Sequence, residues 1–219
     1  MNSLTEVKGN KLYTVGEEIA NAIIHGVGAL LSIAACVLLV IAAAQSGSAL
    51  KVVCASIYGA SLIILFLMST LYHALSPEKA KKVFRKFDHA TIFLLIAGSY
   101  TPIVLCSIGG ALGWVMFGLV WTLAVIGIIF NAISVEKFKV FSMITYVFMG
   151  WCVVFIAKPT IQSLDPKGLL LLFLGGLAYT FGIIFYKMKN TKYMHTIWHL
   201  FVLAGAILQY FCIQLYVVV

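Results

Sequence analysis

Charged residues are scarce in this sequence. Asp, Glu, Lys and Arg together make up 10% of its 219 residues, whereas 63% of the residues are hydrophobic. A typical soluble domain has about 25% charged and about 45–50% apolar residues. The composition therefore excludes a soluble globular protein and indicates that most of the chain lies in lipid.

Paired cysteines are also lacking. The sequence has five cysteines, and no two of them form the CxxC pattern that is typical of thiolate zinc sites. We therefore expect neither a thiolate metal site nor a disulfide framework. We interpret the cysteines as small apolar packing residues in the outer half of the membrane. They are Cys36, Cys54, Cys106, Cys152 and Cys212.

Long apolar runs dominate the chain instead. A bilayer core about 30 Å thick is crossed by about 20 helical residues, and seven runs approach or exceed this length. Because the runs are continuous, they favour helices over the alternating strands of a membrane barrel. The predicted fold is an all-α integral membrane protein, a bundle of seven transmembrane helices. The spans are Ile19–Ala44, Leu50–Leu75, Phe87–Ile108, Leu112–Ile133, Val140–Ala157, Gly168–Tyr186 and His195–Val217.

The first eighteen residues are polar and differ from a cleavable secretory signal, which has a short basic lead before its apolar core. We expect residues 1–18 to form an N-terminal segment and residues 19–219 to form one domain of seven helices. Within the third span, Gly98, Ser99 and Pro102 predict a kink, because proline removes a backbone donor and crowds the preceding turn. Gly109 and Gly110 favour a turn or a close approach of helices.

Basic residues divide unequally between the two sets of loops, twelve against three of the fifteen in the chain. Cytoplasmic loops retain Lys and Arg, so the N-terminus is predicted to lie in the cytoplasm and the C-terminus outside. The basic stretch Pro77–Lys86 is expected to be a cytoplasmic loop. The net charge of +8 then reflects topology, and no nucleic-acid partner is expected. The three outer cations are Lys51, Lys158 and Lys167.

All five histidines fall near the cytoplasmic boundary in this topology. His195 and His199 are four residues apart on one helix face, a spacing with which two imidazoles bind one metal ion. With His73 they would provide three ligands and leave the fourth position of a tetrahedral zinc open, as in catalytic sites. The sequence therefore predicts a Zn²⁺ site, although a single boundary histidine is more often an interfacial hydrogen-bonding group.

Two further residues are candidates for catalysis beside this zinc. Asp88 lies at the same depth and is a candidate general base for a water molecule that zinc activates. Ser69 lies one turn before His73 and is a candidate donor to an imidazole or to a developing oxyanion. Alternatively, Asp88 pairs with Arg85 or Lys86, and Ser69 bonds the carbonyl four residues earlier. Residues expected to surround the ligands are Glu18, Asn21, His25 and His89.

Four stretches of the chain resemble the signatures of the hemolysin III proteins, the bacterial branch of the progestin and adipoQ receptor family. They appear in the family's order and span nearly the whole sequence. The stretches are Glu17–Gly26, Ser69–His73, Phe87–Ala90 followed by Ala97–Pro102, and His195–His199.

The resemblance implies a seven-helix fold, zinc held by the histidines that match His73, His195 and His199, and Asp88 near the zinc. Related receptors and alkaline ceramidases with the same Ser, Asp and His pattern imply a membrane-embedded hydrolase of lipid amides or esters, with a membrane lipid as substrate or ligand. The family name implies cytolysis instead, and a third alternative is a receptor or regulator of membrane lipids with structural zinc. In each case the expected location is the bacterial plasma membrane.

Overall fold

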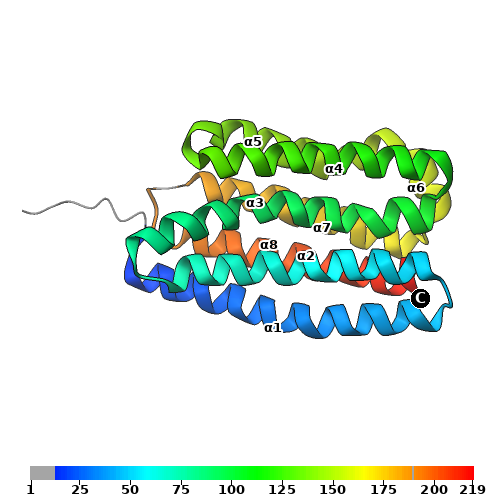
Figure 1. Ribbon diagram of the computed structural model, residues 1–219, viewed down its shortest axis with the longest axis horizontal. Helices are drawn as coiled ribbons and strands as arrows, with labels where there is room; N and C mark the ends of the chain where they lie inside the picture. Colours follow the sequence, from blue (N-terminus) through cyan, green and yellow to red (C-terminus); the bar gives the residue numbers. More distant parts are fainter. Residues whose placement is uncertain (1–12, 189) are drawn as a thin grey trace, which may run out of the picture.

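The computed structural model describes residues 13–188 and 190–219, and in this part of the chain all regular secondary structure is helical. Seven segments are long and apolar enough to cross a membrane, which confirms the predicted fold class (Figure 1). Four are single helices: α1 (Val15–Gln45), α2 (Ala49–Ala74), α4 (Gly110–Ile133) and α7 (Pro166–Lys187).

The other three segments change their winding along their length. Helix α3 (Glu78–Pro102) continues as a π-helix (Ile103–Ile108), and α5 (Val135–Gly150) continues through a 3₁₀ turn (Cys152–Ile156) into α6 (Ala157–Ser163). Helix α8 (Met194–Ile213) also ends in a π-helix (Gln214–Val218).

Short polar side chains fix where several helices begin. Thr14 caps α1 in a reciprocal capping box, in which its hydroxyl accepts from the Glu17 backbone and the Glu17 carboxylate accepts from the Thr14 backbone. Ser48 and Ser134 cap α2 and α5 with their hydroxyls as single acceptors. Asp165 caps α7, whose first residue is a proline that needs no hydrogen-bond acceptor.

Two helices begin well before their predicted spans. Helix α3 starts at Glu78 and α5 at Val135, so the basic stretch predicted as a loop forms the first turns of α3. Pro77 provides the extended residue before the helix, and Lys82 pairs with Glu78 one turn earlier at 2.7 Å. The prediction is wrong here because apolar content marks the part of a helix in hydrocarbon and not its charged ends.

The predicted kink near Pro102 takes the form of a change in helix type. The α-helix ends at Pro102 and the wider π-helix follows directly. The predicted turn follows at Gly109 and Gly110, which adopt φ values of 65° and 58°. Such positive values favour glycine, so this pair reverses the chain into α4.

The long helices run side by side, and α1 begins at the end of the bundle opposite to the C-terminus (Figure 1). Helix α1 packs against α2 and α8, while α3 packs against α2, α4 and α5. We call the end at which α2 stops and α8 starts the histidine end, and the opposite one the far end. The end of α2 and the start of α8 therefore both lie near the start of α1.

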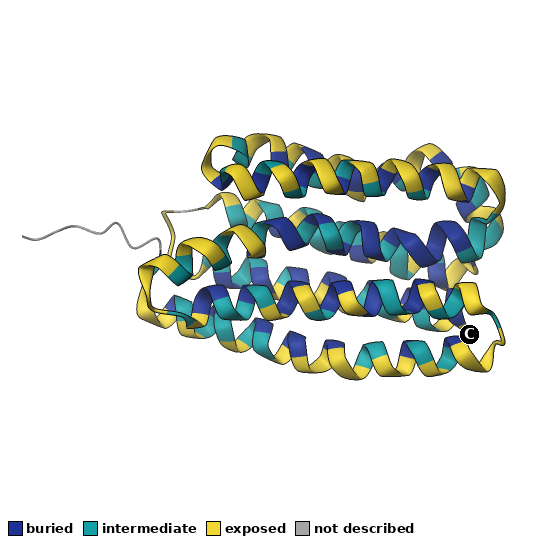
Figure 2. Ribbon diagram, in the orientation of Figure 1, coloured by how far each residue is buried: buried dark blue, intermediate teal, exposed yellow. Residues whose placement is uncertain are grey.

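Buried residues lie on the inner faces of the helices and exposed ones on the outside of the bundle (Figure 2). Many of the exposed residues are large and hydrophobic, and many of the buried ones are polar. Large hydrophobic residues such as Leu30, Val115 and Phe155 are exposed on α1, α4 and the 3₁₀ turn. Asn21, Thr101 and Asn131 are buried. This distribution suits a protein whose surroundings are lipid, because buried polar groups find partners in the bundle and not in hydrocarbon.

Candidate metal site

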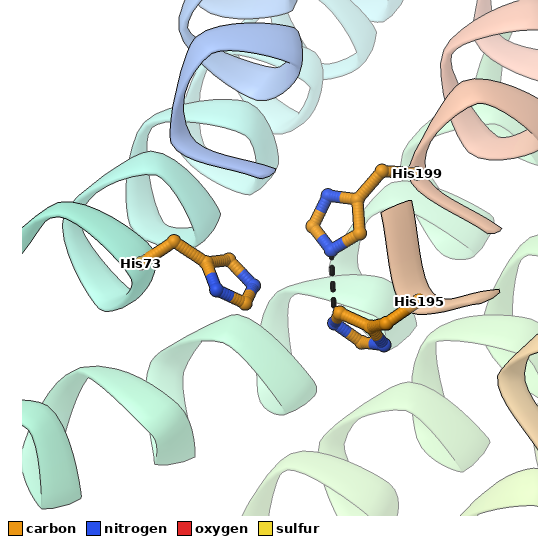
Figure 3. A group of neighbouring side chains, drawn as sticks. All are labelled: His73, His195 and His199. Carbon is orange, nitrogen blue, oxygen red and sulfur yellow. Dashed lines mark hydrogen bonds between the residues drawn. The ribbon is translucent and has the colours of Figure 1, made fainter. Parts of the chain in front are cut away.

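Three histidines meet at the histidine end. His73 comes from the last turn of α2, and His195 and His199 come from the first two turns of α8 (Figure 3). Each offers one nitrogen, and the three nitrogens lie within 4.8 Å of one another. The Nε2 atoms of His195 and His199 are 3.0 Å apart. The group is compact enough to hold one metal ion, with imidazole ligands from two helices.

A carboxylate sets the orientation of His73. Its Nδ1 lies 2.6 Å from Oε2 of Glu18, and Lys81 Nζ lies 2.7 Å from the other oxygen of that carboxylate. The Asn21 amide nitrogen is 3.5 Å from the same Nδ1. We assign the tautomer from the shorter contact: Nδ1 carries the proton and donates a hydrogen bond to the Glu18 carboxylate. Nε2 is then an unprotonated acceptor that points to the other histidines, as in carboxylate–histidine–metal arrangements.

Unpaired buried polar atoms concentrate at this site. Seven buried side-chain nitrogens or oxygens in the described part of the chain have no hydrogen-bond partner, and five of them belong to four residues here. They are both ring nitrogens of His25, Ser69 Oγ, His73 Nε2 and His199 Nδ1. An unpaired buried polar atom costs about 1–3 kcal/mol, so such a cluster is expected where a ligand provides the missing partner. The unpaired His73 Nε2 fits a metal ion.

His25 is a fourth imidazole in contact with the group. Its ring centroid lies 3.7 Å from that of His199, and it is fully enclosed between His199 and Phe66. Asn21, one turn earlier on α1, accepts a hydrogen bond from Thr196 at 2.7 Å. Helix α1 thus packs directly against the start of α8, and His25 and Asn21 both lie beside the group of three histidines.

In the part of the chain that the structure describes, Asp88 forms no ion pair with Arg85 or Lys86, and Ser69 does not bond the carbonyl four residues earlier. Arg85 pairs with Glu136, and Lys86 donates to the carbonyl of Ala132 at 2.6 Å, so neither neutralises Asp88. The Asp88 side chain remains buried, with 6% of its surface exposed. Ser69 Oγ does not bond the helix backbone and is unpaired. Both groups are therefore available to a ligand.

His89 lies beside Asp88 on α3 but takes no part in the ring contacts of the three histidines in residues 13–188 and 190–219. Its carbonyl accepts a hydrogen bond from the Tyr146 hydroxyl at 2.6 Å. That hydroxyl in turn accepts from the Asn131 amide at 3.1 Å. His89 is therefore joined through its backbone to a polar contact between α3, α4 and α5, and it lines the same cavity as Asp88 and His25.

A largely apolar cavity extends from the histidine end between α3, α5, α7 and α8. At the histidine end it is lined by His25, Asp88 and Trp198, and farther along by Tyr100, Trp151 and Gln209. Asp88 and Tyr100 are both on α3, twelve residues apart, so at about 1.5 Å per residue the cavity is about 18 Å long on this wall. His73, His195 and His199 are not among its lining residues, but the His25 and Trp198 rings, which line it, both contact the ring of His199.

Sequence reasoning missed Lys81 and Tyr13, which contact the site. The charge pattern marks Lys81 only as an orientation signal. The Tyr13 ring stacks on His195, with ring centroids 4.5 Å apart and planes at 24°. Burial raises the pKa of the Tyr13 hydroxyl, so the ring is uncharged. Tyr13 precedes the first helix in a polar segment, and nothing in its local sequence indicates a contact with a residue near the other end of the chain.

Known proteins match the chain along almost its whole length. The family described as haemolysin-III related matches residues 13–210. The chain belongs to the haemolysin-III-related family. Hemolysin-3 of Bacillus cereus is 44% identical over 214 residues, which cover 98% of each chain. The Hemolysin-3 homolog of Bacillus subtilis (strain 168) is 45% identical over 207 residues, covering 94% of this chain and 97% of that protein.

A more distant relative is the human monocyte to macrophage differentiation factor, which is 31% identical over 222 residues, covering 99% of this chain and 91% of that protein. The resemblance expected from the sequence stretches is confirmed. The family match begins at Tyr13, so the residue that stacks on His195 lies inside the matched region.

Proposed function

We propose that this protein is a zinc-dependent hydrolase that cleaves an amide or ester bond of a membrane lipid. The observation that carries the proposal is a group of three histidines, one of them oriented by a carboxylate, beside an apolar cavity that is lined by Asp88 and by the His25 and Trp198 rings in contact with His199. Imidazole nitrogens suit Zn²⁺, and three of them leave one position of its tetrahedron open.

His73, His195 and His199 would hold the ion. When bound, zinc acts as a Lewis acid that activates water and polarises a carbonyl group. Asp88 has no cationic partner in the described chain and would accept the proton of the attacking water and return it to the leaving amine or alcohol. Ser69 would donate a hydrogen bond to the carbonyl oxygen as negative charge develops on it.

The cavity supports a lipid as the substrate. Its walls are mostly apolar, and the histidines, the aspartate and the lysine that line it all lie toward the histidine end; they are His25, His89, Asp88 and Lys139. A hydrocarbon chain would occupy the apolar length while the bond to be cleaved lies at the polar end. The unequal distribution of basic residues supports a histidine end on the cytoplasmic side of the bacterial plasma membrane.

Hydrolysis by zinc-loaded, detergent-purified protein tests the proposal. A panel of acyl amides and acyl esters should include at least one lipid that is cleaved, and Asp88→Asn should lower kcat by about 10²–10⁴-fold because the general base is lost. The variant should keep its zinc, since Asp88 is not among the three ligands. If wild type binds zinc but cleaves no member of the panel, the receptor or regulator alternative with structural zinc is favoured.

A second candidate function is cytolysis, which the names of the two bacillar relatives support. Expression in a bacterium that is mixed with erythrocytes tests it through the release of haemoglobin. Lysis that persists in the Asp88→Asn variant would favour this function over hydrolysis. Lysis that disappears with Asp88→Asn would make it a consequence of lipid cleavage.

A further inference from the structure

Tyr13 lies over the one ligand of the candidate metal site that is not fully buried. His73 and His199 are buried, whereas His195 is partly exposed. The Tyr13 ring stacks on His195 and also lies 5.7 Å from the ring of His73. One aromatic ring therefore lies against a histidine of α8 and near a histidine of α2, and it covers one face of the His195 ring.

A hydrogen-bonded clamp ties the start of α1 to the start of α8 next to this ring. Oε2 of Glu17 accepts hydrogen bonds from the backbone and the hydroxyl of Thr14, at 2.8 and 2.7 Å. Oε1 of the same carboxylate accepts from the Tyr193 backbone at 2.7 Å. The two oxygens of one carboxylate thus join the residue before α1 to the residue before α8.

Tyr193 and Gly16 are tightly constrained where the starts of α8 and α1 meet. Tyr193 adopts a φ of 63°, a left-handed conformation that is unfavourable for a residue with a side chain. Its hydroxyl packs against Gly16, where an added Cβ would lie 2.8 Å away. Strain of this kind persists where surrounding contacts enforce it. Here those contacts fix the residue that immediately follows Tyr13 in the chain.

We propose that Tyr13 is a positioning residue that covers one face of His195 in the three-histidine site and fixes the ring of His195. The inference rests on the proposed function for its purpose, because a covered site retains its metal and excludes bulk water. The cover itself is a property of the chain with or without metal. The aromatic ring performs this role and the hydroxyl does not, since the contact is a stack of two ring planes.

Chemical modification of histidines in metal-free protein tests the cover directly. After chelation, diethyl pyrocarbonate is added and its rate of reaction with His195 is followed by mass spectrometry of the peptide. Tyr13→Ala should raise this rate by about tenfold, because both the stacked partner and the cover are lost. Tyr13→Phe should leave the rate within about twofold of wild type, because the stack remains.

Two internal references make the comparison specific. His89 is also partly exposed but belongs to a different contact, so its reaction rate should be the same in all variants. Tyr210→Ala removes a partly buried tyrosine of α8 toward the far end and should not change the rate at His195.

The variant Glu17→Ala tests the clamp, because it breaks the clamp but leaves the Tyr13 ring. It should raise the rate at His195 by a smaller factor than Tyr13→Ala.

Zinc release provides the second readout. Transfer of zinc to an excess of coloured chelator should be about tenfold faster from Tyr13→Ala than from wild type and unchanged for Tyr13→Phe. Unchanged modification of His195 in Tyr13→Ala would overturn the inference, whatever the protein does to lipids. Wild-type protein that binds no zinc would overturn the proposed function, while the modification rates would still decide whether Tyr13 covers the site.

Discussion

The two ends of the bundle differ in whether their polar side chains have hydrogen-bond partners. Toward the far end, Lys51 donates to the carbonyl of Val218, Gln209 to that of Leu172, and Cys212 to that of Gly168. At the histidine end, five buried side-chain atoms have no partner. Polar groups that bond to backbone carbonyls join helices to one another, whereas unpaired ones cost stability and are retained where a ligand needs them.

Two other buried atoms in the described part of the chain are also unpaired, Gln214 Oε1 at the far end and the Tyr58 hydroxyl. They are isolated atoms on different elements. Four of the five atoms at the histidine end instead belong to His25, His73 and His199, and the first two rings both contact the ring of His199. Concentration, and not the mere presence of unpaired atoms, distinguishes a site from a packing fault, and substitutions at the two ends should therefore have opposite effects.

The largest expected effect is the loss of metal when the three histidines are removed together. Wild type is expected to purify with about one zinc ion per chain, and His73→Ala, His195→Ala, His199→Ala should reduce this to background, because no ligand remains. Metal analysis of the detergent-purified proteins checks it. His89→Ala provides the control at the same end. Equal zinc in the triple variant and wild type would contradict the assignment.

Loss of the carboxylate behind His73 should have an intermediate effect. Glu18→Gln removes the charge that holds the Nδ1 proton, so zinc affinity should fall by about 10–100-fold. Competition with a chelator of known affinity measures the change. Glu136→Gln is the matched control, since that carboxylate pairs with Arg85 outside the site. The role of Glu18 would be refuted by equal affinities of the two variants.

The smallest expected effect is a change in the free energy of unfolding when either of two serines on α2 is replaced. Ser61 and Ser69 are two turns apart on α2, and each is 1% exposed, but Ser61 donates to the Tyr58 carbonyl while Ser69 is unpaired. In metal-free protein Ser69→Ala should raise the free energy of unfolding by about 1 kcal/mol, because a buried unpaired hydroxyl is removed.

Ser61→Ala should lower the free energy of unfolding by about 0.5–1.5 kcal/mol, because a hydrogen bond is lost. Thermal or denaturant unfolding in detergent measures both variants. In the hydrolase assay the order reverses: Ser69→Ala should lose turnover, while Ser61→Ala should keep it. Destabilisation by both substitutions would show that Ser69 has a structural partner in the folded protein.

The fold is predictable because lipid imposes a simple length requirement. Each span needs about twenty apolar residues, and all seven are visible in the sequence. The charged starts of α3 and α5 are not, because hydropathy does not register helical turns that extend beyond hydrocarbon. Pro77 and Ser134, a helix-starting proline and an N-cap serine, are the signals that place these starts correctly.

The candidate site is partly predictable for a different reason. Depth in the membrane and four-residue spacing can both be derived from the sequence, and together they are enough to group His73, His195 and His199. The contacts of Lys81 and Tyr13 are not accessible in this way. Each depends on which helices are neighbours around the bundle, and that arrangement is set by packing between distant segments and not by local sequence.

The division of the three histidines between α2 and α8 has a consequence for biosynthesis. The second span enters the membrane early, but its imidazole gains its companions only when the final span has been inserted. A nascent or C-terminally truncated chain therefore cannot assemble the ion-binding group. Acquisition of the ion would mark the completed protein and would fasten its last helix to its first ones.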